Sequence, residues 1–467
     1  MEQLLFRLKK YIPAKVFALL QPAYHFLLAF FAALRYGFPA SKLKVIGVTG
    51  TKGKTTTVEL LHAVLAESGA PVASLSSLRF KIGEREIQNK LKMTMPGRFF
   101  VQKFLRDALR AGAAYVILEV PSQGIAQFRH RFIRFHTAVM TNVAPEHLEA
   151  HGGFENYLRS KLDLFWRLPK TSAVVINHDD PVWPRFSAAT GAHKIFYSSE
   201  EIVFNARAWK IEHPVIGDQG ISFSCHDIPI VSSLLGTFNF YNILAAMAVG
   251  LAEHVSLERI GAGVGKVSGI AGRMEFVQKT PFQVVVDYAH TPDSLRNVYA
   301  FFGKNKNVNP VRSSRGALNP AFAQSVWHSS PGQAAGHSAS NGVKNRKKKL
   351  ICVLGATGGG RDRWKRPEFA KIAEEFCYEI IVTNEDPYDE DAEAIVDQIV
   401  AGFSHTQEFR KIMDRREAIR AAVHFAQPGD TVVITGKGSE PWIMGPEGEK
   451  IPWDDRAVAR EELERLR

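Results

Sequence analysis

Apolar runs typical of buried strands alternate along the chain with segments whose apolar residues recur at helical spacing. In the first half, strands are predicted at 45–48, 114–120, 135–143 and 172–180, and helices at 101–114 and 234–252. In the second half, strands are predicted at 282–295, 349–357, 378–387 and 431–442, and helices at 368–376 and 414–426. This alternation favours parallel, doubly wound α/β sheets, and we expect two such domains, at 44–271 and 272–467.

The first 43 residues have a different pattern and are expected to form an apolar, basic helical segment. Residues 16–34 carry no charge, but Gln21, Pro22 and His25 interrupt the apolar run. Three interpretations stay open: helices packed on the body, peripheral membrane contact through residues 16–34, or a membrane span. No small-residue cleavage site marks a secretory signal, so we expect a cytoplasmic chain, with association with the inner face of the membrane as an alternative.

The net charge of +12 is concentrated in two segments. Residues 303–349 carry nine basic residues and no acid, and residues 1–44 contribute a further +6, which leaves the remainder of the chain at −3. We therefore expect no nucleic-acid partner. Residues 303–349 are rich in Asn, Ser, Gly and Pro, which predicts a disordered insert. Three scattered cysteines argue against a disulfide framework and against a zinc site; they are Cys225, Cys352 and Cys377.

Residues 45–61, VIGVTGTKGKTTTVELL, predict a strand, a glycine-spaced turn and the start of a helix. This order suits a phosphate-binding loop, because backbone N–H groups and the positive end of the helix can face the phosphates. Lys54 would reach the β- and γ-phosphates and Thr55 would ligate Mg²⁺, although Val48 stands where a strict Walker A motif has glycine. The implied cofactors are ATP and Mg²⁺. The residues expected to bind the nucleotide here are Gly50, Thr51, Lys52, Gly53, Lys54, Thr55 and Thr56.

Polar residues follow several predicted strands. Glu119 ends the strand at 114–120, where a second Mg²⁺ ligand would lie, although an ordinary surface acid is the alternative. His147 and His151 are four residues apart, but no third ligand accompanies them and zinc is not expected. Lys161 lies on the following predicted helix.

The second half of the chain offers a similar set. Asn239 and Asn242 open an apolar helix and could cap it or contact adenine. Asp287 and His290 lie at the end of the strand that begins at residue 282.

These spaced motifs resemble the Mur ligases, most closely the MurE type of UDP-N-acetylmuramyl-tripeptide synthetase. The resemblance rests on GTKGKTTT (50–57), LEVPSQGIAQFR (118–129), TNVAPEHLEAHG (141–152), GTFNFYNILAA (236–246), GRMEFV (272–277), DYAHTPDSL (287–295), GGGRDRWKRP (358–367), TNEDP (383–387) and GKGSE (436–440). It implies an α/β fold with a central P-loop ATPase domain and a C-terminal Rossmann-like domain. A short apolar segment stands where the family has its N-terminal UDP-binding domain, which puts UDP recognition in question.

The resemblance implies an ADP-forming acid–amino-acid ligase of cell-wall synthesis. ATP would phosphorylate the carboxylate of a UDP-N-acetylmuramoyl-dipeptide-like acceptor, and the amine of a free amino acid would attack the acyl phosphate. Family positions imply catalytic roles for Lys54, Glu119, His147, Lys161 and Arg273. Metal binding is implied for Thr55, Glu119, His147 and an N-carbamylated Lys161. Nucleotide contacts are implied for Asn242, Arg273, Asp287 and His290. Substrate contacts are implied for Thr94, Ser122, Arg129, Arg361, Asp386, Tyr388, Gly436 and Glu440.

The amino-acid pocket departs from one family pattern. Family members that take meso-diaminopimelate carry Asp-Asn-Pro-Arg, whereas this chain has Glu385-Asp386-Pro387-Tyr388. Loss of the arginine removes a bidentate partner for a second carboxylate, and the acids favour a cation. We therefore expect L-lysine or ornithine in preference to diaminopimelate, with drift at Tyr388 and another cation in its place as the alternative.

Two further functions remain open from the sequence. One is a membrane-associated poly-γ-glutamate-type ligase, and the other is a non-catalytic nucleotide-binding partner subunit. DYAHTPDSL and GKGSE favour the Mur assignment over the first, and the complete set of phosphate and metal residues disfavours the second.

Overall fold

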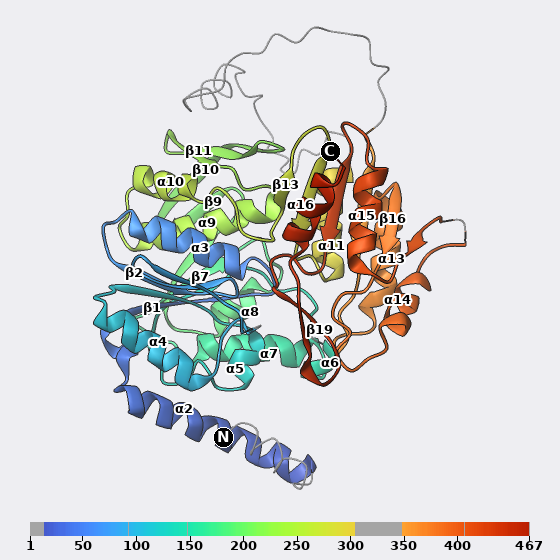
Figure 1. Cartoon of the computed structure of the whole chain (residues 1–467). Coiled ribbons are helices and arrows are strands. Elements are labelled where there is room, and N and C mark those ends of the chain that lie inside the picture. The colour runs from blue at the N-terminus through green and yellow to red at the C-terminus, as the bar shows by residue number, and fades with distance from the viewer. Residues whose placement is uncertain (1–13, 92, 147, 304–347, 406, 467) are drawn as a thin grey trace.

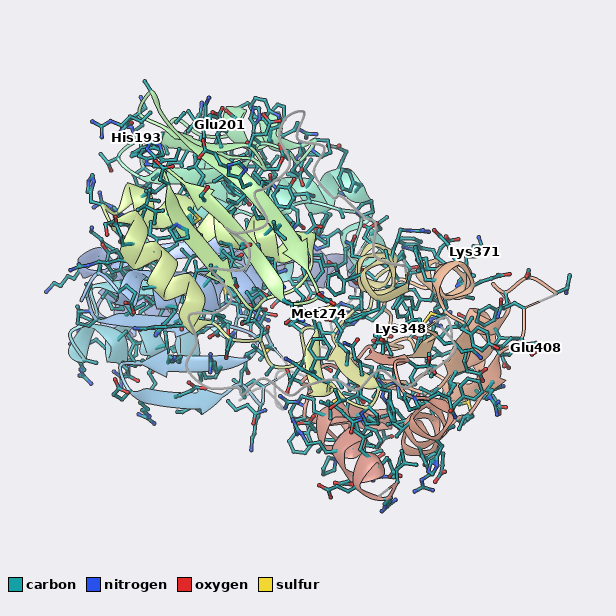
Figure 2. All side chains as sticks on the ribbon, turned by 90° about the horizontal axis from the view of Figure 1, so that it is seen from above. His193, Glu201, Met274, Lys348, Lys371 and Glu408 are labelled. Atoms are coloured by element: carbon teal, nitrogen blue, oxygen red, sulfur yellow. A yellow bond between two sulfur atoms is a disulfide. The ribbon has the colours of Figure 1, made fainter. Side chains whose placement is uncertain are left out.

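The computed structural model describes residues 14–91, 93–146, 148–303, 348–405 and 407–466. His147 and nearly all of the predicted insert at 303–349 therefore lie outside the described residues. Two α/β bodies lie side by side (Figure 1). Viewed from above, Met274 lies where the bodies meet, while Glu201 and Glu408 lie toward their outer ends (Figure 2). The predicted boundary at 271–272 falls in the connection between the helix that ends at Lys266 and the strand that begins at Glu275.

The first body is built on a sheet in the order β12-β11-β10-β9-β8-β7-β6-β1-β5-β2-β3-β4. Its middle is a run of parallel strands, made of β8 (His193–Tyr197), β7 (Ala173–Asn177), β6 (Phe135–Met140), β1 (Lys44–Thr49), β5 (Tyr115–Glu119) and β2 (Val72–Leu75). β1 pairs with β5 on one side and β6 on the other. The loops that follow these three strands consequently emerge at one edge, as expected for parallel strands.

Antiparallel strands extend both ends of this sheet and were not predicted from the sequence. They are β3 (Arg79–Ile82), β4 (Arg85–Gln88), β9 (Glu201–Phe204), β10 (Arg207–Gly217), β11 (Gly220–Cys225) and β12 (Ile228–Ser232). Several of them are partly exposed, and β4 is exposed along its whole length, so they lack the continuous apolar run that identifies a buried strand.

Helices cover both faces of this sheet (Figure 1). On one face, α3 (Lys54–Ala66) packs against α9 (Thr237–Ala252) and α10 (Leu257–Lys266). The other face carries α4 (Arg98–Arg110), α5 (Ser122–Ala126), α7 (Phe154–Trp166) and α8 (Trp183–Ala188), and the short α6 (Leu148–His151) precedes α7. The predicted doubly wound arrangement is confirmed.

The second body has a smaller sheet in the order β13-β14-β18-β15-β16-β17. All its pairs are parallel except that of β13 with β14. The strands are β13 (Glu275–Gln278), β14 (Gln283–Asp287), β15 (Leu350–Leu354), β16 (Glu379–Val382), β17 (Arg410–Lys411) and β18 (Thr431–Thr435). One face packs against α11 (Pro292–Gly303), α13 (Lys365–Phe376) and α14 (Ala392–Val400), and the other against α15 (Arg415–Phe425) and α16 (Asp455–Glu464). A hairpin of β19 (Trp442–Met444) and β20 (Lys450–Pro452) completes it.

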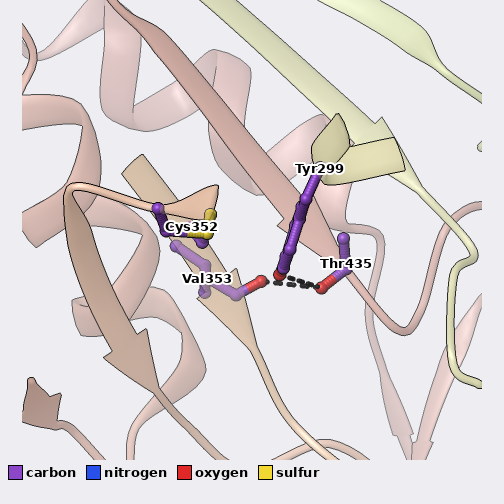
Figure 3. Close-up of a disulfide and its surroundings, with 5 residues drawn as sticks. Tyr299, Cys352, Val353 and Thr435 are labelled. Atoms are coloured by element: carbon purple, nitrogen blue, oxygen red, sulfur yellow. Dashed lines mark hydrogen bonds between the residues drawn. A yellow bond between two sulfur atoms is a disulfide. The ribbon is translucent and has the colours of Figure 1, made fainter. Parts of the chain in front are cut away.

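Cys352 in β15 and Cys377, directly after α13, form a disulfide with their Cα atoms 6.1 Å apart (Figure 3). The prediction against disulfides is wrong for this pair, because the two cysteines are 25 residues apart and only the strand–helix packing brings them together. Next to Cys352, the carbonyl of Val353 accepts a hydrogen bond from Thr435 Oγ1 at 3.0 Å, and Tyr299 Oη lies 3.2 Å from that hydroxyl.

Within the described residues, the N-terminal segment forms α2 (Ala14–Tyr36), which packs against α4, followed by a 3₁₀ turn at Pro39–Lys42. The helix continues through Pro22, one of the residues that interrupt the apolar run. Proline has no backbone N–H, so the carbonyl four residues before it lacks its helical hydrogen bond. Because Pro22 is exposed, water can hydrogen-bond to this carbonyl instead. Among the described residues, no helix combines the length and apolar character needed to cross a bilayer.

Candidate active site

A cleft of about 1560 Å³ lies between the two bodies, and residues of both line it. The predicted site residues that line it are Thr51, Lys52, Gly53, Lys54, Thr55, Thr56, Thr94, Glu119, Ser122, Arg129, Asn242, Arg273, Asp287, His290, Arg361, Asp386, Tyr388, Gly436 and Glu440. Gly50 belongs to the phosphate loop, and Lys161 lies directly behind it, as described below. His147 lies outside the described residues, so its predicted role remains a prediction.

Close packing requires glycine at two positions of the phosphate loop. Gly50 has φ +150°, and a Cβ there would lie 1.9 Å from Thr141 Oγ1. Gly53, directly before α3, has φ +81°, and a Cβ there would lie 2.1 Å from Asn242 Oδ1. The loop therefore lies tight against the residues after β6 and the first turns of α9, with the N-terminus of α3 facing the cleft.

Two lysines converge on one backbone carbonyl behind this loop. Lys54 Nζ lies 3.0 Å and Lys161 Nζ 2.7 Å from the oxygen of Gly50. Burial lowers the pKa of both side chains, that of Lys161 strongly, and repulsion from Lys54 lowers the pKa of Lys161 further. A neutral Lys161 amine is a nucleophile, whereas the ammonium is not.

A cluster of oxygen atoms lies beside these lysines. Thr55 Oγ1 donates to Glu119 Oε2 at 3.1 Å, and Ser77 Oγ lies 2.8 Å from the same hydroxyl. The backbone N–H of Ser77 also donates to Glu119 Oε2, at 2.9 Å. Hard oxygen donors of this kind suit Mg²⁺, which usually takes one or two protein ligands together with phosphate oxygens and water. Within the described part of the chain, no group of three His, Cys, Asp or Glu side chains forms a metal cluster.

Asp287 and Arg273 face this loop from the C-terminal body. Both carboxylate oxygens of Asp287 accept backbone hydrogen bonds at 2.7 Å, from Met274 and Ala289. Burial raises the pKa of Asp287, while Arg273 opposes the shift. The guanidinium of Arg273 lies 4.1 Å from the centre of the Tyr288 ring, so stacking orients this cation beside the cleft.

His290 and Glu146 connect the two bodies at the mouth of the phosphate loop. Glu146 Oε1 lies 3.0 Å from Lys52 Nζ and 3.5 Å from His290 Nε2. Burial lowers the pKa of His290 to about 4, so the imidazole is neutral at physiological pH. Its Nδ1 lies 2.7 Å from the carbonyl of Tyr288, which can only accept, and the proton therefore resides on Nδ1.

Asn242 is fixed by neighbours on its own helix and on α3. Its Nδ2 donates to Asn239 Oδ1 at 2.9 Å, and its Oδ1 accepts from Thr57 Oγ1 at 3.3 Å. Asn239 in turn donates to the carbonyl of Leu235 at 2.8 Å. The pair thus holds the start of α9 against the phosphate loop.

The residues expected to contact the acceptor lie on the wall of the cleft that the central body forms. Ser122 Oγ lies 3.2 Å from His151 Nε2 at the start of α5. Arg129 is partly buried and donates to the carbonyl of Met95 and to Gln127 Oε1. Thr94 lines the cleft next to this arginine. This wall offers a cation and hydroxyls, which suit an anionic, hydroxyl-bearing ligand.

The C-terminal body supplies an acidic pocket at the ends of β16 and β18. Buried Lys437 Nζ lies 2.6 Å from Asp386 Oδ1 and 2.8 Å from Glu440 Oε2. Tyr288 Oη donates to the other oxygen of Glu440, at 2.9 Å. Arg361 also faces this pocket and lines the cleft.

Glu385 is the most unusual member of this pocket. Its Oε1 accepts from Thr357 Oγ1 at 2.7 Å, but among the described residues its buried Oε2 has no hydrogen-bond partner. Burial raises the pKa of this carboxyl. Gly436 has φ +111°, and a Cβ there would lie 2.7 Å from Glu385 Oε2, so glycine keeps the space beside this oxygen open. Tyr388, at φ +53°, packs its ring against Gly359.

A carboxylate of the C-terminal body also holds the start of α6. Asp362 Oδ2 accepts from the backbone N–H of Leu148 at 3.3 Å, and Oδ1 accepts from that of Glu149 at 3.1 Å. Glu149 Oε1 accepts in return from the backbone N–H of Arg363 at 2.8 Å. The loop that carries Arg361 is thereby joined to the central body.

Sequence reasoning did not single out Ser77, Glu146 or Lys437 as site residues. Ser77 follows a short strand and belongs to no motif, so no local signal identifies it. Glu146 and Lys437 lie inside the quoted motifs TNVAPEHLEAHG and GKGSE, and their charge was the available signal.

Comparisons with known proteins agree with this architecture. Residues 48–250 match the Mur ligase middle domain, and residues 333–438 match the Mur ligase, glutamate ligase domain. A relative from Syntrophomonas wolfei, UDP-N-acetylmuramoyl-L-alanyl-D-glutamate--2,6-diaminopimelate ligase, is 35% identical over 447 residues, which cover 93% of this chain and 81% of the relative. A UDP-N-acetylmuramyl-tripeptide synthetase from Roseiflexus sp. is 34% identical over 465 residues, covering 94% of this chain and 82% of the relative.

Solved structures show the same fold. A UDP-N-acetylmuramoyl-L-alanyl-D-glutamate--2,6-diaminopimelate ligase aligns with a TM-score of 0.56 and 27% identity, covering 91% of this chain and 79% of that one. Folylpolyglutamate synthase from Mycobacterium tuberculosis aligns with a TM-score of 0.63 and 17% identity, covering 88% and 92%, which is a likeness of fold alone. The chain therefore belongs to the Mur ligase family and is an ATP-dependent, ADP-forming amide ligase of peptidoglycan synthesis.

Proposed function

We propose that this chain adds the third stem-peptide residue to a UDP-N-acetylmuramoyl-dipeptide-like acceptor, with L-lysine or ornithine preferred over diaminopimelate. The observation that carries the proposal is the single cleft that joins the phosphate loop around Lys54 to the pocket around Arg361 and Glu385. An ATP site and an amino-acid site on one cleft are what such a ligation requires.

In the first step an acceptor carboxylate oxygen attacks the γ-phosphorus of ATP, the bond to the bridging oxygen breaks, and ADP leaves. Lys54 and the N-terminus of α3 bind the phosphates, and Arg273 offsets the charge that develops on the transferred group. Thr55 and Glu119 would hold Mg²⁺, which supplies further charge neutralisation when bound. Asn242 and Asp287 contact the adenosine part, with His290 beside them. Thr94, Ser122 and Arg129 position the acceptor.

In the second step the free amine attacks the acyl carbon. A C–N bond forms, phosphate leaves with the electron pair of its C–O bond, and the amine releases a proton to water. Arg361 binds the α-carboxylate of the amino acid, since a guanidinium can hold it through two hydrogen bonds. Glu385, Asp386 and Glu440 attract the side-chain ammonium, and the open oxygen of Glu385 offers it an acceptor. Gly436 and Tyr388 shape this pocket.

Lys161 acts as a carbamate in this proposal. Its amine forms an N–C bond with CO₂ and loses a proton to solvent, which converts a cation beside Lys54 into an anion. The lowered pKa supports this, because only the neutral amine reacts. The new carboxylate would join the second Mg²⁺ site, together with His147.

The test is turnover by the purified full chain with ATP, UDP-N-acetylmuramoyl-L-alanyl-D-glutamate and one amino acid at a time. We expect ADP release that requires both acceptor and amino acid, a product of the expected mass, and higher kcat/KM for L-lysine or ornithine than for meso-diaminopimelate. Turnover with diaminopimelate as the best amino acid would overturn the specificity. Absence of amino-acid-dependent ADP release would overturn the proposal as a whole.

A further inference from the structure

Helix α2 presents an apolar face to the outside of the molecule. Leu20, Tyr24, Leu27, Phe31 and Leu34 are each between 40% and 55% exposed. Successive helical residues are turned by about 100°, so these five side chains fall within a sector of about 80° that runs for about 21 Å along the helix. We call these five side chains the outer stripe of α2. Figure 1 shows α2 along one edge of the molecule, with the other described elements on one side of it only.

The opposite side of α2 is firmly packed. Ala29, Ala32 and Ala33 are buried, and the ring of the half-buried Phe30 lies 5.6 Å from that of Phe132. The inner side therefore fixes the orientation of the helix on the body. The outer stripe faces outward as a consequence of this packing, and no folding requirement within the described residues accounts for its apolar character.

Charge indicates what covers the stripe. Helix α2 contains no acidic residue, and residues 1–44 carry a net charge of +6. Arg35 and Lys42 are exposed beside the C-terminal end of the helix. An apolar stripe flanked by cations is complementary to a bilayer surface that contains anionic lipid, where leucine and aromatic side chains enter the interface and basic ones contact headgroups.

The stripe residues are spaced four and three apart in turn, as in a coiled coil, so a second copy of the chain is the competing occupant. In coiled coils, charged residues flank such a stripe and pair across the interface. Here the flanking positions are Gln21, Ala23, Leu28, Phe30 and Arg35. Arg35 is charged, but α2 contains no acidic residue that could pair with it across such an interface. We propose that the outer stripe of α2 binds the surface of an anionic membrane and holds the ligase against it.

The test is co-sedimentation of the full chain with vesicles. The probes are vesicles of equal parts phosphatidylglycerol and phosphatidylcholine, and vesicles of phosphatidylcholine alone. We expect binding to the mixed vesicles that weakens in high salt, and much weaker binding to phosphatidylcholine. Replacing two stripe residues, Leu27→Gln with Phe31→Gln, should lower the partition coefficient on mixed vesicles by at least about tenfold, because each side chain loses apolar area that would enter the bilayer.

Controls separate this effect from misfolding. Val215→Gln changes an exposed apolar residue of β10, remote from α2, and should leave vesicle binding unchanged. The double variant should retain the wild-type melting temperature and ligase activity in the absence of vesicles, since both side chains point away from the body. Wild-type protein that fails to bind mixed vesicles would overturn the proposal. A lipid-independent dimer that the double variant converts to a monomer would overturn it in favour of a second copy.

Discussion

The substitution Tyr388→Arg should shift amino-acid selection from lysine toward meso-diaminopimelate. Tyr388 lines the same cleft as Arg361 and Asp386. An arginine at this position would offer two N–H groups to the distal carboxylate that diaminopimelate has and lysine lacks. A hydrogen bond to a charged group contributes about 1.5–3 kcal/mol, which corresponds to about 10- to 150-fold in kcat/KM. The new cation would also repel the lysine ammonium, by about 1 kcal/mol at a separation of about 4 Å if water fills the cleft between them.

Together these effects amount to about 2.5–4 kcal/mol, and repulsion between the new arginine and Arg361 places the expected result at the lower end. We therefore expect the ratio of kcat/KM for diaminopimelate to that for lysine to rise by about 100-fold. The assay is ADP release at saturating ATP and acceptor, with each amino acid varied. Tyr388→Phe is the matched control and should leave the ratio within about twofold. An unchanged ratio in Tyr388→Arg would show that this position does not face the amino-acid side chain.

Three further perturbations follow from buried groups. Lys161→Gln should lower kcat by at least about 100-fold. Wild-type activity should fall in CO₂-depleted buffer and return when bicarbonate is added. Activity that is independent of CO₂, together with the absence of a carbamate signal in ¹³C NMR, would contradict the carbamate. In the wild type, the buried Arg415 donates two hydrogen bonds of 2.7 and 2.8 Å to Asp455. Asp455→Asn removes this counter-ion, and urea unfolding should show that the free energy of unfolding falls by about 3–5 kcal/mol. As a control, Lys103→Gln removes the exposed ion pair with Asp107 and should lower the free energy of unfolding by no more than about 0.5 kcal/mol. Equal losses in Asp455→Asn and Lys103→Gln would refute the role of burial. Because burial raises the folded-state pKa of Glu385, the unfolded chain ionises first as pH rises and stability declines through that window. Glu385→Gln should therefore match wild type in urea unfolding below about pH 4 and be more stable above the raised pKa, while its KM for lysine increases; a variant less stable than wild type at neutral pH would contradict this.

The parts of the fold that the sequence predicted correctly are those with a strong local signal. The strands β5 and β7 are largely continuous apolar runs, and the phosphate loop is a contiguous motif between a strand and a helix. The residues beyond these strands could be grouped because parallel strands deliver their ends to one edge of a sheet. The cleft therefore contains nearly all the residues expected from motif positions.

The features missed from the sequence depend on contacts between distant segments. The disulfide of Cys352 and Cys377 requires the packing of α13 on β15, and Ser77 reaches Glu119 only because β2 and β5 are neighbours. Neither of these follows from residue spacing, since spacing carries no information on which loops meet in space.

The contact between Asp362 and the start of α6 has a thermodynamic consequence. This carboxylate is next to Arg361, on the amino-acid side, while α6 follows the loop that carries Glu146, which contacts Lys52 of the phosphate loop. The proposed nucleotide and amino-acid sites thus lie on either side of one joint, and a ligand that orders one loop would reduce the entropy cost of ordering the other. Each ligand should then raise the affinity for the other by the same factor, so that occupancy of the two sites becomes cooperative without any second subunit.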